Sequence, residues 1–176
     1  MVSTSNNDPV FQLSKLAKTD SLSHAYLFYG EAKTEMKSYA LTQAKKLEAR
    51  ELESGGQRIN GPLPEPILID ATIIDAENSS SLGIDIVREI KNYLWQKPLK
   101  SKKRTVIVQG AEELTREAQN AILKILEDAP KSALIILITT SIERLLPTII
   151  SRLQKVYIPV NKELESLKKI APNQRA

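Results

Sequence analysis

Residues 25–38 read AYLFYGEAKTEMKS, an apolar run that ends in a glycine and is followed by a stretch with helical patterning. A strand, a tight turn and a helix in this order form the unit in which α/β nucleotide-binding proteins carry their phosphate loop. The turn region holds Gly30, Lys37 and Ser38, the residue types that such a loop uses. Whether it is a working phosphate cradle depends on the spacing of these three residues.

The pattern of residues 25–38 continues along most of the chain. Four further apolar runs rich in β-branched residues follow the first at 25–30, and they lie at 66–72, 105–110, 133–140 and 154–159. Their continuous apolarity indicates strands buried on both faces, as in a parallel sheet. Helical patterns occupy 36–53, 83–95 and 115–128, between the runs. We therefore predict an α/β fold with a five-stranded parallel sheet and helices on both faces.

The composition limits the chemistry of the chain. It has 176 residues, no cysteine and one histidine, His24, which excludes disulfides, thiol nucleophiles and His-rich metal sites. We predict one main domain, 1–160, with 53–66 as a loop rich in glycine and proline. The first ten residues do not resemble a signal peptide and no apolar run is long enough to span a membrane, so we expect a soluble, cytoplasmic protein without membrane partners.

The loop after the first apolar run departs from the phosphate-loop pattern. A working loop reads G-x-x-x-x-G-K-[ST], in which backbone N–H groups wrap the phosphates and the lysine reaches them. Counted from Gly30, Glu35 replaces the second glycine and Met36 replaces the lysine. A shift by one residue recovers Lys37 and Ser38 but puts Met36 in place of the glycine. We favour a simple strand-to-helix turn; the alternative is a weakly active ATPase that uses the shifted loop.

The end of the third apolar run has also changed. An ATPase of this type ends that strand with adjacent acids that hold Mg²⁺ and polarise water. Gln109 and Gly110 stand at those places, and we expect the following Glu112 and Glu113 to be surface acids. Both halves of the nucleotide site are thus altered, which predicts a scaffold without the chemistry.

A basic cluster lies in the segment 97–104. Because the net charge is only +4, a solvated loop is the favoured interpretation. The alternative is a surface that faces nucleic acid or an acidic partner. The residues are Lys97, Lys100, Lys102, Lys103 and Arg104.

Three stretches together resemble a known family: LSHAYLFYG at 22–30, GAEELTREAQNAILKILEDAP at 110–130 and LITTSIERLLPTIISRLQ at 137–154. They are similar to the clamp-loader subunits of bacterial DNA polymerase III, most of all the delta-prime branch, which is close kin of the gamma/tau ATPase. The similarity covers about residues 22–159.

The resemblance implies an AAA+ fold of the P-loop NTPase type in a five-subunit ring. It implies that this subunit hydrolyses no ATP but offers an arginine in trans to ATP held by a neighbour, from a Ser-Arg-Cys motif. That motif reads Ser151-Arg152-Leu153 here, which makes Arg152, with Ser151, the candidate catalytic element. The plain alternative is an arginine that pairs with a helix end or a surface acid.

The resemblance also implies a sensor at the end of the fourth apolar run, where Thr139 and Thr140 lie. Because the phosphate loop is altered, we interpret both threonines as polar residues that end a strand.

The expected cofactors and partners follow from the same resemblance. We expect no cofactor, because ATP would be held by the neighbouring subunit, and no zinc, because the family's four-cysteine module is replaced by the cysteine-free segment 53–66. The expected partners are gamma/tau ATPase subunits and the delta subunit, with the sliding clamp and primed DNA reached through the complex. Residues 161–176 would start a linker or a truncated lid domain, in either a fragment or a short homologue. A scaffold that uses neither ATP nor Arg152 is the remaining alternative.

Overall fold

The computed structural model describes residues 23–54, 68–76 and 83–159. The predicted tail 161–176, the N-terminal segment and most of the predicted loop 53–66 lie outside these residues. Strands and helices alternate in the order β1 Ala25–Tyr29, α2 Lys33–Ser54, β2 Ala71–Asp75, α3 Ile84–Leu94, β3 Arg104–Gln109, η1 Ala111–Glu113, α4 Arg116–Asp128, β4 Ala133–Thr139, η2 Ile142–Arg144, α5 Pro147–Ile150 and β5 Gln154–Tyr157, where η1 and η2 are single 3₁₀ turns.

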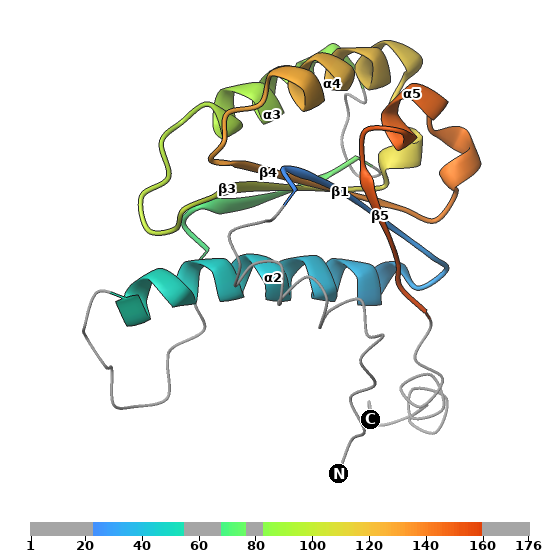
Figure 1. Cartoon of the computed structure of the whole chain (residues 1–176). Coiled ribbons are helices and arrows are strands. Elements are labelled where there is room, and N and C mark those ends of the chain that lie inside the picture. The colour runs from blue at the N-terminus through green and yellow to red at the C-terminus, as the bar shows by residue number, and fades with distance from the viewer. Residues whose placement is uncertain (1–22, 55–67, 77–82, 160–176) are drawn as a thin grey trace, which may run out of the picture.

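The strands form one five-stranded sheet in the order β2-β3-β4-β1-β5, and every pairing in it is parallel. Figure 1 shows α2 on one face of this sheet and α3 and α4 on the other. The predicted α/β class, the five parallel strands and the helices on both faces are therefore confirmed. No helix in the described part of the chain is both long and apolar enough to cross a membrane.

The three inner strands separate two hydrophobic cores. In β4, Leu134, Ile136 and Ile138 pack on the α2 side of the sheet. Ile135 and Leu137 point to the other side, toward the apolar faces of α3 and α4. Since consecutive side chains of a strand point to opposite faces, a continuous apolar run is what a sheet covered on both sides requires.

The edge strands differ from the prediction. The second strand was predicted at 66–72, but β2 spans Ala71–Asp75 and its side chains are only partly buried. The backbone N–H groups of Ile69 and Asp70 donate to the carboxylate of Glu48 on α2, at 3.2 and 2.8 Å, and not to a neighbouring strand. The first backbone bond to β3 is the one that the Asp70 carbonyl accepts from the N–H of Thr105 at 2.7 Å, so the apolar residues before Asp70 precede the strand. At the other edge β5 is largely exposed, so burial on both faces holds for β1, β3 and β4 only.

The carboxylate of Asp70 anchors the loop between α3 and β3. It accepts hydrogen bonds from the backbone N–H groups of Leu99, Lys100 and Ser101 at 2.7, 2.6 and 2.7 Å. Arg104 completes the set with an ion pair of 2.9 Å, in which the Asp70 side chain is fully buried. Burial alone would oppose ionisation, but these four donors outweigh it and hold the pKa of Asp70 below its ordinary value.

We expect Asp70→Asn to destabilise the protein by about 3–5 kcal/mol at neutral pH, because it leaves the Arg104 guanidinium buried without its counter-ion. A carboxyl whose pKa is lowered by folding adds stability above its ordinary pKa, and that contribution is lost as the pH falls through the folded pKa. The difference in unfolding free energy between the wild type and Asp70→Asn should therefore be largest at pH 7 and decrease below about pH 4. Urea unfolding across this range measures it, and a gap that stays constant with pH would contradict the assignment.

Candidate functional site

Because all pairings are parallel, the carboxyl ends of all five strands lie along the same end of the sheet, across the strand direction from β2 to β5. In register, Tyr29 of β1 lies beside Thr139 of β4, and Asp75 of β2 lies beside Gln109 of β3. Open α/β sheets bind their ligands outside this end. The residues predicted from the nucleotide-site pattern, from Gly30 to Thr140, are thus brought to one end of the fold.

Gly30 is required by packing within the chain itself. Its φ is +155°, and a Cβ placed on it would lie 2.3 Å from the carbonyl oxygen of Ile158. The N–H of Ile158 donates to the carbonyl of Tyr29 at 3.0 Å, which continues the β5 pairing just past the strand. The glycine therefore has a structural reason that involves no phosphate.

The helix that follows begins too early for either register of a phosphate loop. Only residues 30–32 separate β1 from α2, which starts at Lys33. Met36 is fully buried against the sheet, and its N–H donates to the carbonyl of Ala32 at 2.9 Å. Lys37 and Ser38 consequently lie on a formed helix, and the Ser38 carbonyl accepts from Thr42 Oγ1 at 2.8 Å. A phosphate loop instead presents free N–H groups around the anion.

Glu112 does not lie on the surface, so the prediction for this residue was wrong. It is 6% exposed, and its Oε1 accepts from the N–H and the hydroxyl of Thr140 at 3.0 and 2.6 Å. Gly110, with φ 71° and ψ 41°, lets the chain turn back after β3 so that this contact can form. Burial opposes ionisation of Glu112, yet the Thr140 hydrogen bonds prevail and lower its pKa.

Both threonines of the predicted sensor position make contacts within the chain. Thr139 is buried and its hydroxyl oxygen accepts from the N–H of Ser141 at 3.1 Å. Thr140 is exposed but is held by Glu112. Gln109, which replaces the first acid of the nucleotide site, is buried as well.

Arg152 lies just past α5 and is partly exposed. Its Nη2 forms an ion pair of 2.6 Å with Glu127 of α4, in which the side chains are 41% and 50% exposed. Its Nη1 donates to the carbonyl of Thr148 at 3.0 Å, and the Ser151 hydroxyl donates to the same carbonyl at 2.9 Å. An ion pair this exposed is worth about 0–1 kcal/mol, so another anion can displace Glu127 from the guanidinium.

Gln119 orients the segment that carries Arg152, a role that the sequence analysis missed. Its amide nitrogen donates to the carbonyls of Leu114 and Arg144 at 3.1 and 3.3 Å, and its amide oxygen accepts from the N–H of Leu146 at 2.8 Å. Pro147 then starts α5. The available signal was an amide directly beside the apolar stripe of α4, where a buried polar side chain needs partners.

The predicted basic cluster is divided in the structure. Arg104 is buried with Asp70 and lies 4.1 Å from the Tyr93 ring centroid, so its assignment to an exposed surface was wrong. Lys103 donates from Nζ to the carbonyl of Lys131 at 2.6 Å. Lys100 and Lys102 are exposed, and so is Lys97. Asp70 and the ring of Tyr93 thus hold Arg104 in the interior, apart from the lysines that lie beside it in the sequence.

Residues 5–162 match the protein family described as DNA polymerase III, delta subunit. The chain belongs to this family. The resemblance to clamp-loader subunits of DNA polymerase III is therefore confirmed at the level of the family.

Named relatives agree with this assignment. The chain is 33% identical over 145 residues to the DNA polymerase III subunit delta' of Bacillus subtilis, covering 77% of this chain and 42% of that protein. It is 33% identical over 143 residues to the subunit gamma/tau of Mycoplasma pneumoniae, covering 78% of this chain and 20% of that protein. The chain thus spans from a fifth to about two fifths of the length of these two relatives.

The fold also matches solved structures. A DNA polymerase III gamma subunit-related protein from Thermotoga maritima superposes with a TM-score of 0.62 at 33% identity, over 90% of this chain and 49% of that one. Drosophila ORC, bound to DNA in its structure, shares the fold at a TM-score of 0.51 and 10% identity, over 92% of this chain and 30% of that one. The architecture is that of the AAA+ proteins.

We expect Gly30→Ala to destabilise the protein by at least about 2 kcal/mol, because the added methyl group meets the backbone of Ile158. Gly83→Ala is the matched control, since nothing lies within 4 Å of a Cβ at that position. Because Gly83 is the N-cap residue of α3, where alanine is less favourable than glycine, the effect of this substitution should be about 1 kcal/mol or less. Urea unfolding of the two variants measures the difference, and equal losses would show that the Ile158 contact is unimportant.

Proposed function

We propose that this chain is a clamp-loader subunit of DNA replication that supplies Arg152 in trans to ATP bound by a neighbouring gamma/tau subunit. The observation that carries the proposal is the state of Arg152. It is retained in the Ser-Arg pair, is partly exposed and is held by an exposed, displaceable partner. A guanidinium aimed at a γ-phosphate stabilises the charge that develops in phosphoryl transfer.

A second observation supports the proposal: the residues at the chain's own predicted nucleotide site already make contacts within the chain. Gly30 packs on Ile158, Met36 is buried on the sheet, and Thr140 binds Glu112. A phosphate entering here would have to compete with each of these contacts. We therefore propose that the chain has no ATPase activity of its own, that it needs no cofactor or zinc, and that the neighbour holds the ATP.

Arg152 has to leave Glu127 before it can reach a phosphate on another subunit. The neighbour's γ-phosphate carries more negative charge than a single carboxylate and offers several acceptor oxygens. Exchange of Glu127 for phosphate is therefore favourable once the subunits pack together. In this proposal Glu127 holds the guanidinium in one orientation until the neighbour arrives.

The proposed partners are the gamma/tau and delta subunits, with the sliding clamp and primed DNA contacted through the assembled loader. Lys100 and Lys102 remain exposed beside Lys97, while Lys103 is partly exposed. In this proposal the exposed lysines of the predicted basic cluster lie on the side of the subunit that faces DNA. Such contacts would weaken as the salt concentration rises, because counterions are released on binding.

We expect Arg152→Ala to slow ATP hydrolysis at the one site that it completes by about a thousandfold or more. In a loader reconstituted with gamma/tau and delta, the total rate of ATP hydrolysis should fall only by the fraction that this one site contributes. Clamp loading should fall with it. Arg152→Lys should restore little, since lysine lacks the planar fork of donors. Glu127→Gln should leave hydrolysis intact or raise it, because it frees the guanidinium.

The matched control for this series is Arg144→Ala. Arg144 is an exposed arginine whose ion pair with Glu113, at 2.7 Å, resembles that of Arg152. It should leave turnover unchanged. If Arg152→Ala assembles normally and hydrolyses ATP at the wild-type rate, the chain is a scaffold and the proposal is wrong.

We expect isothermal titration with Mg-ATP to show no saturable binding to this chain alone up to about 1 mM. The reason is that α2 already uses the Met36 N–H and places Lys37 and Ser38 on a formed helix. Lys37→Ala should therefore change nothing. Binding that is abolished by Lys37→Ala would instead support the weakly active ATPase that uses a shifted loop.

A further inference from the structure

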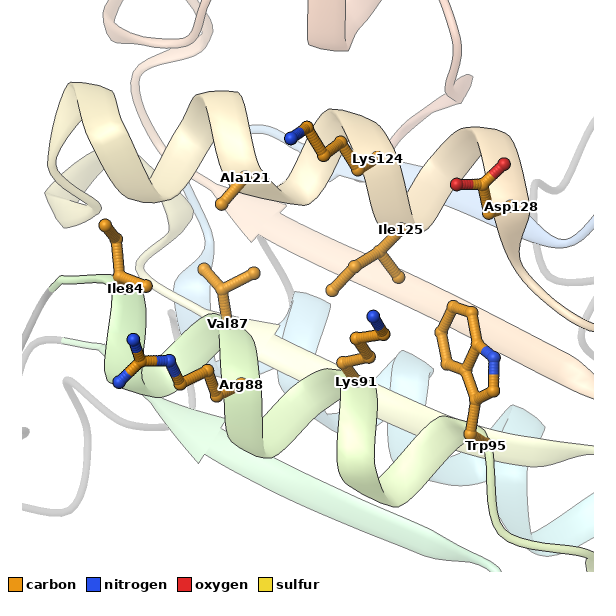
Figure 2. A pocket seen from close by; sticks show the side chains of 9 residues that line it. All are labelled: Ile84, Val87, Arg88, Lys91, Trp95, Ala121, Lys124, Ile125 and Asp128. Carbon is orange, nitrogen blue, oxygen red and sulfur yellow. The ribbon is translucent and has the colours of Figure 1, made fainter.

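The helices α3 and α4 lie side by side in the same direction and leave a groove of about 250 Å³ between them (Figure 2). Its floor is apolar and consists of Val87, Ala121 and Ile125. Ile84 and Trp95 stand at its two ends, at the first residue of α3 and directly after the last. This surface lies on the outer side of the helices and takes no part in the strand-end site described above.

The groove gathers large apolar side chains that the fold leaves in water. Within the described residues, four large apolar side chains are exposed, and two of them, Ile84 at 47% and Trp95 at 43%, line this groove. A third, Leu99 at 77%, follows Trp95 by four residues on the loop that Asp70 holds in place. Contiguous exposed apolar surface bordered by polar groups is the mark of an interaction site.

The rim of the groove is predominantly basic. Arg88, Lys91 and Lys124 line it, against one carboxylate, Asp128. Arg88 is offset by its exposed ion pair with Asp85 at 2.8 Å, which leaves the two lysines as the principal charges. The Nζ of Lys91 lies 5.6 Å from the centroid of the Trp95 ring, so charge and aromatic surface are presented together.

We propose that this groove binds an acidic amphipathic helix of a partner protein. Two helices packed in the same direction present ridges with a straight furrow between them, which fits a third helix. The furrow runs along α3 from Ile84 to Trp95, roughly 16 Å or three helical turns. Apolar side chains at i, i+3, i+4 and i+7 of the partner would meet the floor, and its carboxylates would meet Lys91 and Lys124.

A protein helix fits the groove better than nucleic acid does. The floor offers aliphatic side chains with no hydrogen-bonding groups, whereas nucleic acid is bound mainly through hydrogen bonds to its phosphates, sugars and base edges. A peptide helix with carboxylates on one side satisfies both the apolar floor and the two lysines. Charge complementarity of this kind sets the specificity and the association rate more than the affinity.

The chain provides its own reporter for this inference, because Trp95 is its single tryptophan. The probe is a synthetic peptide of about three helical turns, with leucine at i, i+3, i+4 and i+7 and glutamate beside them. Its titration should give a saturable blue shift of Trp95 emission. Fluorescence anisotropy of a labelled peptide gives a second readout that does not depend on Trp95.

Lys91→Glu/Lys124→Glu should weaken binding of the acidic peptide by about tenfold or more. The matched control is Lys46→Glu/Lys155→Glu, which makes the same charge change on α2 and β5 and should leave binding unchanged. A peptide with lysine in place of every glutamate should bind far more weakly to the wild type.

Five results would overturn the proposal. Three concern the peptides: no saturable binding of the acidic peptide, equal binding of the lysine peptide, or equal weakening by the control pair. Two concern another occupant: a second copy of the chain, seen as a blue shift that grows with protein concentration alone, or a single-stranded oligonucleotide whose binding depends in the same way on Lys91 and Lys124.

Discussion

The complete burial of β4 is the constraint on which the rest of the structure depends. All seven of its residues are buried, and it lies between β3 and β1 at the centre of the sheet. Apolar cover is therefore needed on both faces, and α2 provides it on one side while α3 and α4 provide it on the other. Helical crossovers make the strands parallel, and parallel strands bring their carboxyl ends to one edge. The candidate site exists because of this arrangement.

At that edge the polar groups are used to hold the chain to itself. Glu112, in the turn after β3, accepts a hydrogen bond from Thr140, which follows β4. Gly30 has no side chain, so the backbone of Ile158 after β5 can pack directly against it. The sequence pattern had predicted these positions to correspond to a nucleotide site. Of the buried polar atoms there, Glu112 Oε1 and the Thr139 hydroxyl have partners within the chain, whereas Gln109 Oε1 and Glu112 Oε2 have no hydrogen-bond partner among the described residues. The proposed function accordingly depends on a residue outside it, Arg152.

Two arginines show how burial decides what a guanidinium can do. Arg104 pairs with a fully buried carboxylate, and removal of either partner would leave an uncompensated charge in the interior. Arg152 pairs with an exposed one, so the pair adds little to stability and the guanidinium can exchange partners. The first arginine is therefore part of the framework. The second is available for a role between subunits.

The sequence by itself determined the fold class, because five apolar runs that alternate with helical patterns leave few arrangements other than a covered parallel sheet. It also predicted a helix at 115–128, which is α4, Arg116–Asp128, and it indicated the family through residues 22–30, 110–130 and 137–154. It misplaced β2, since an apolar run is a poor guide at a sheet edge, where burial is partial. Only the tertiary structure decided which polar residues are buried. In a linear pattern Glu112 and Arg104 look like surface residues. In the structure both are buried, because Glu112 bonds to Thr140 and Arg104 pairs with Asp70. Their partners lie 28 and 34 residues away along the chain, and no local pattern records a contact over that separation.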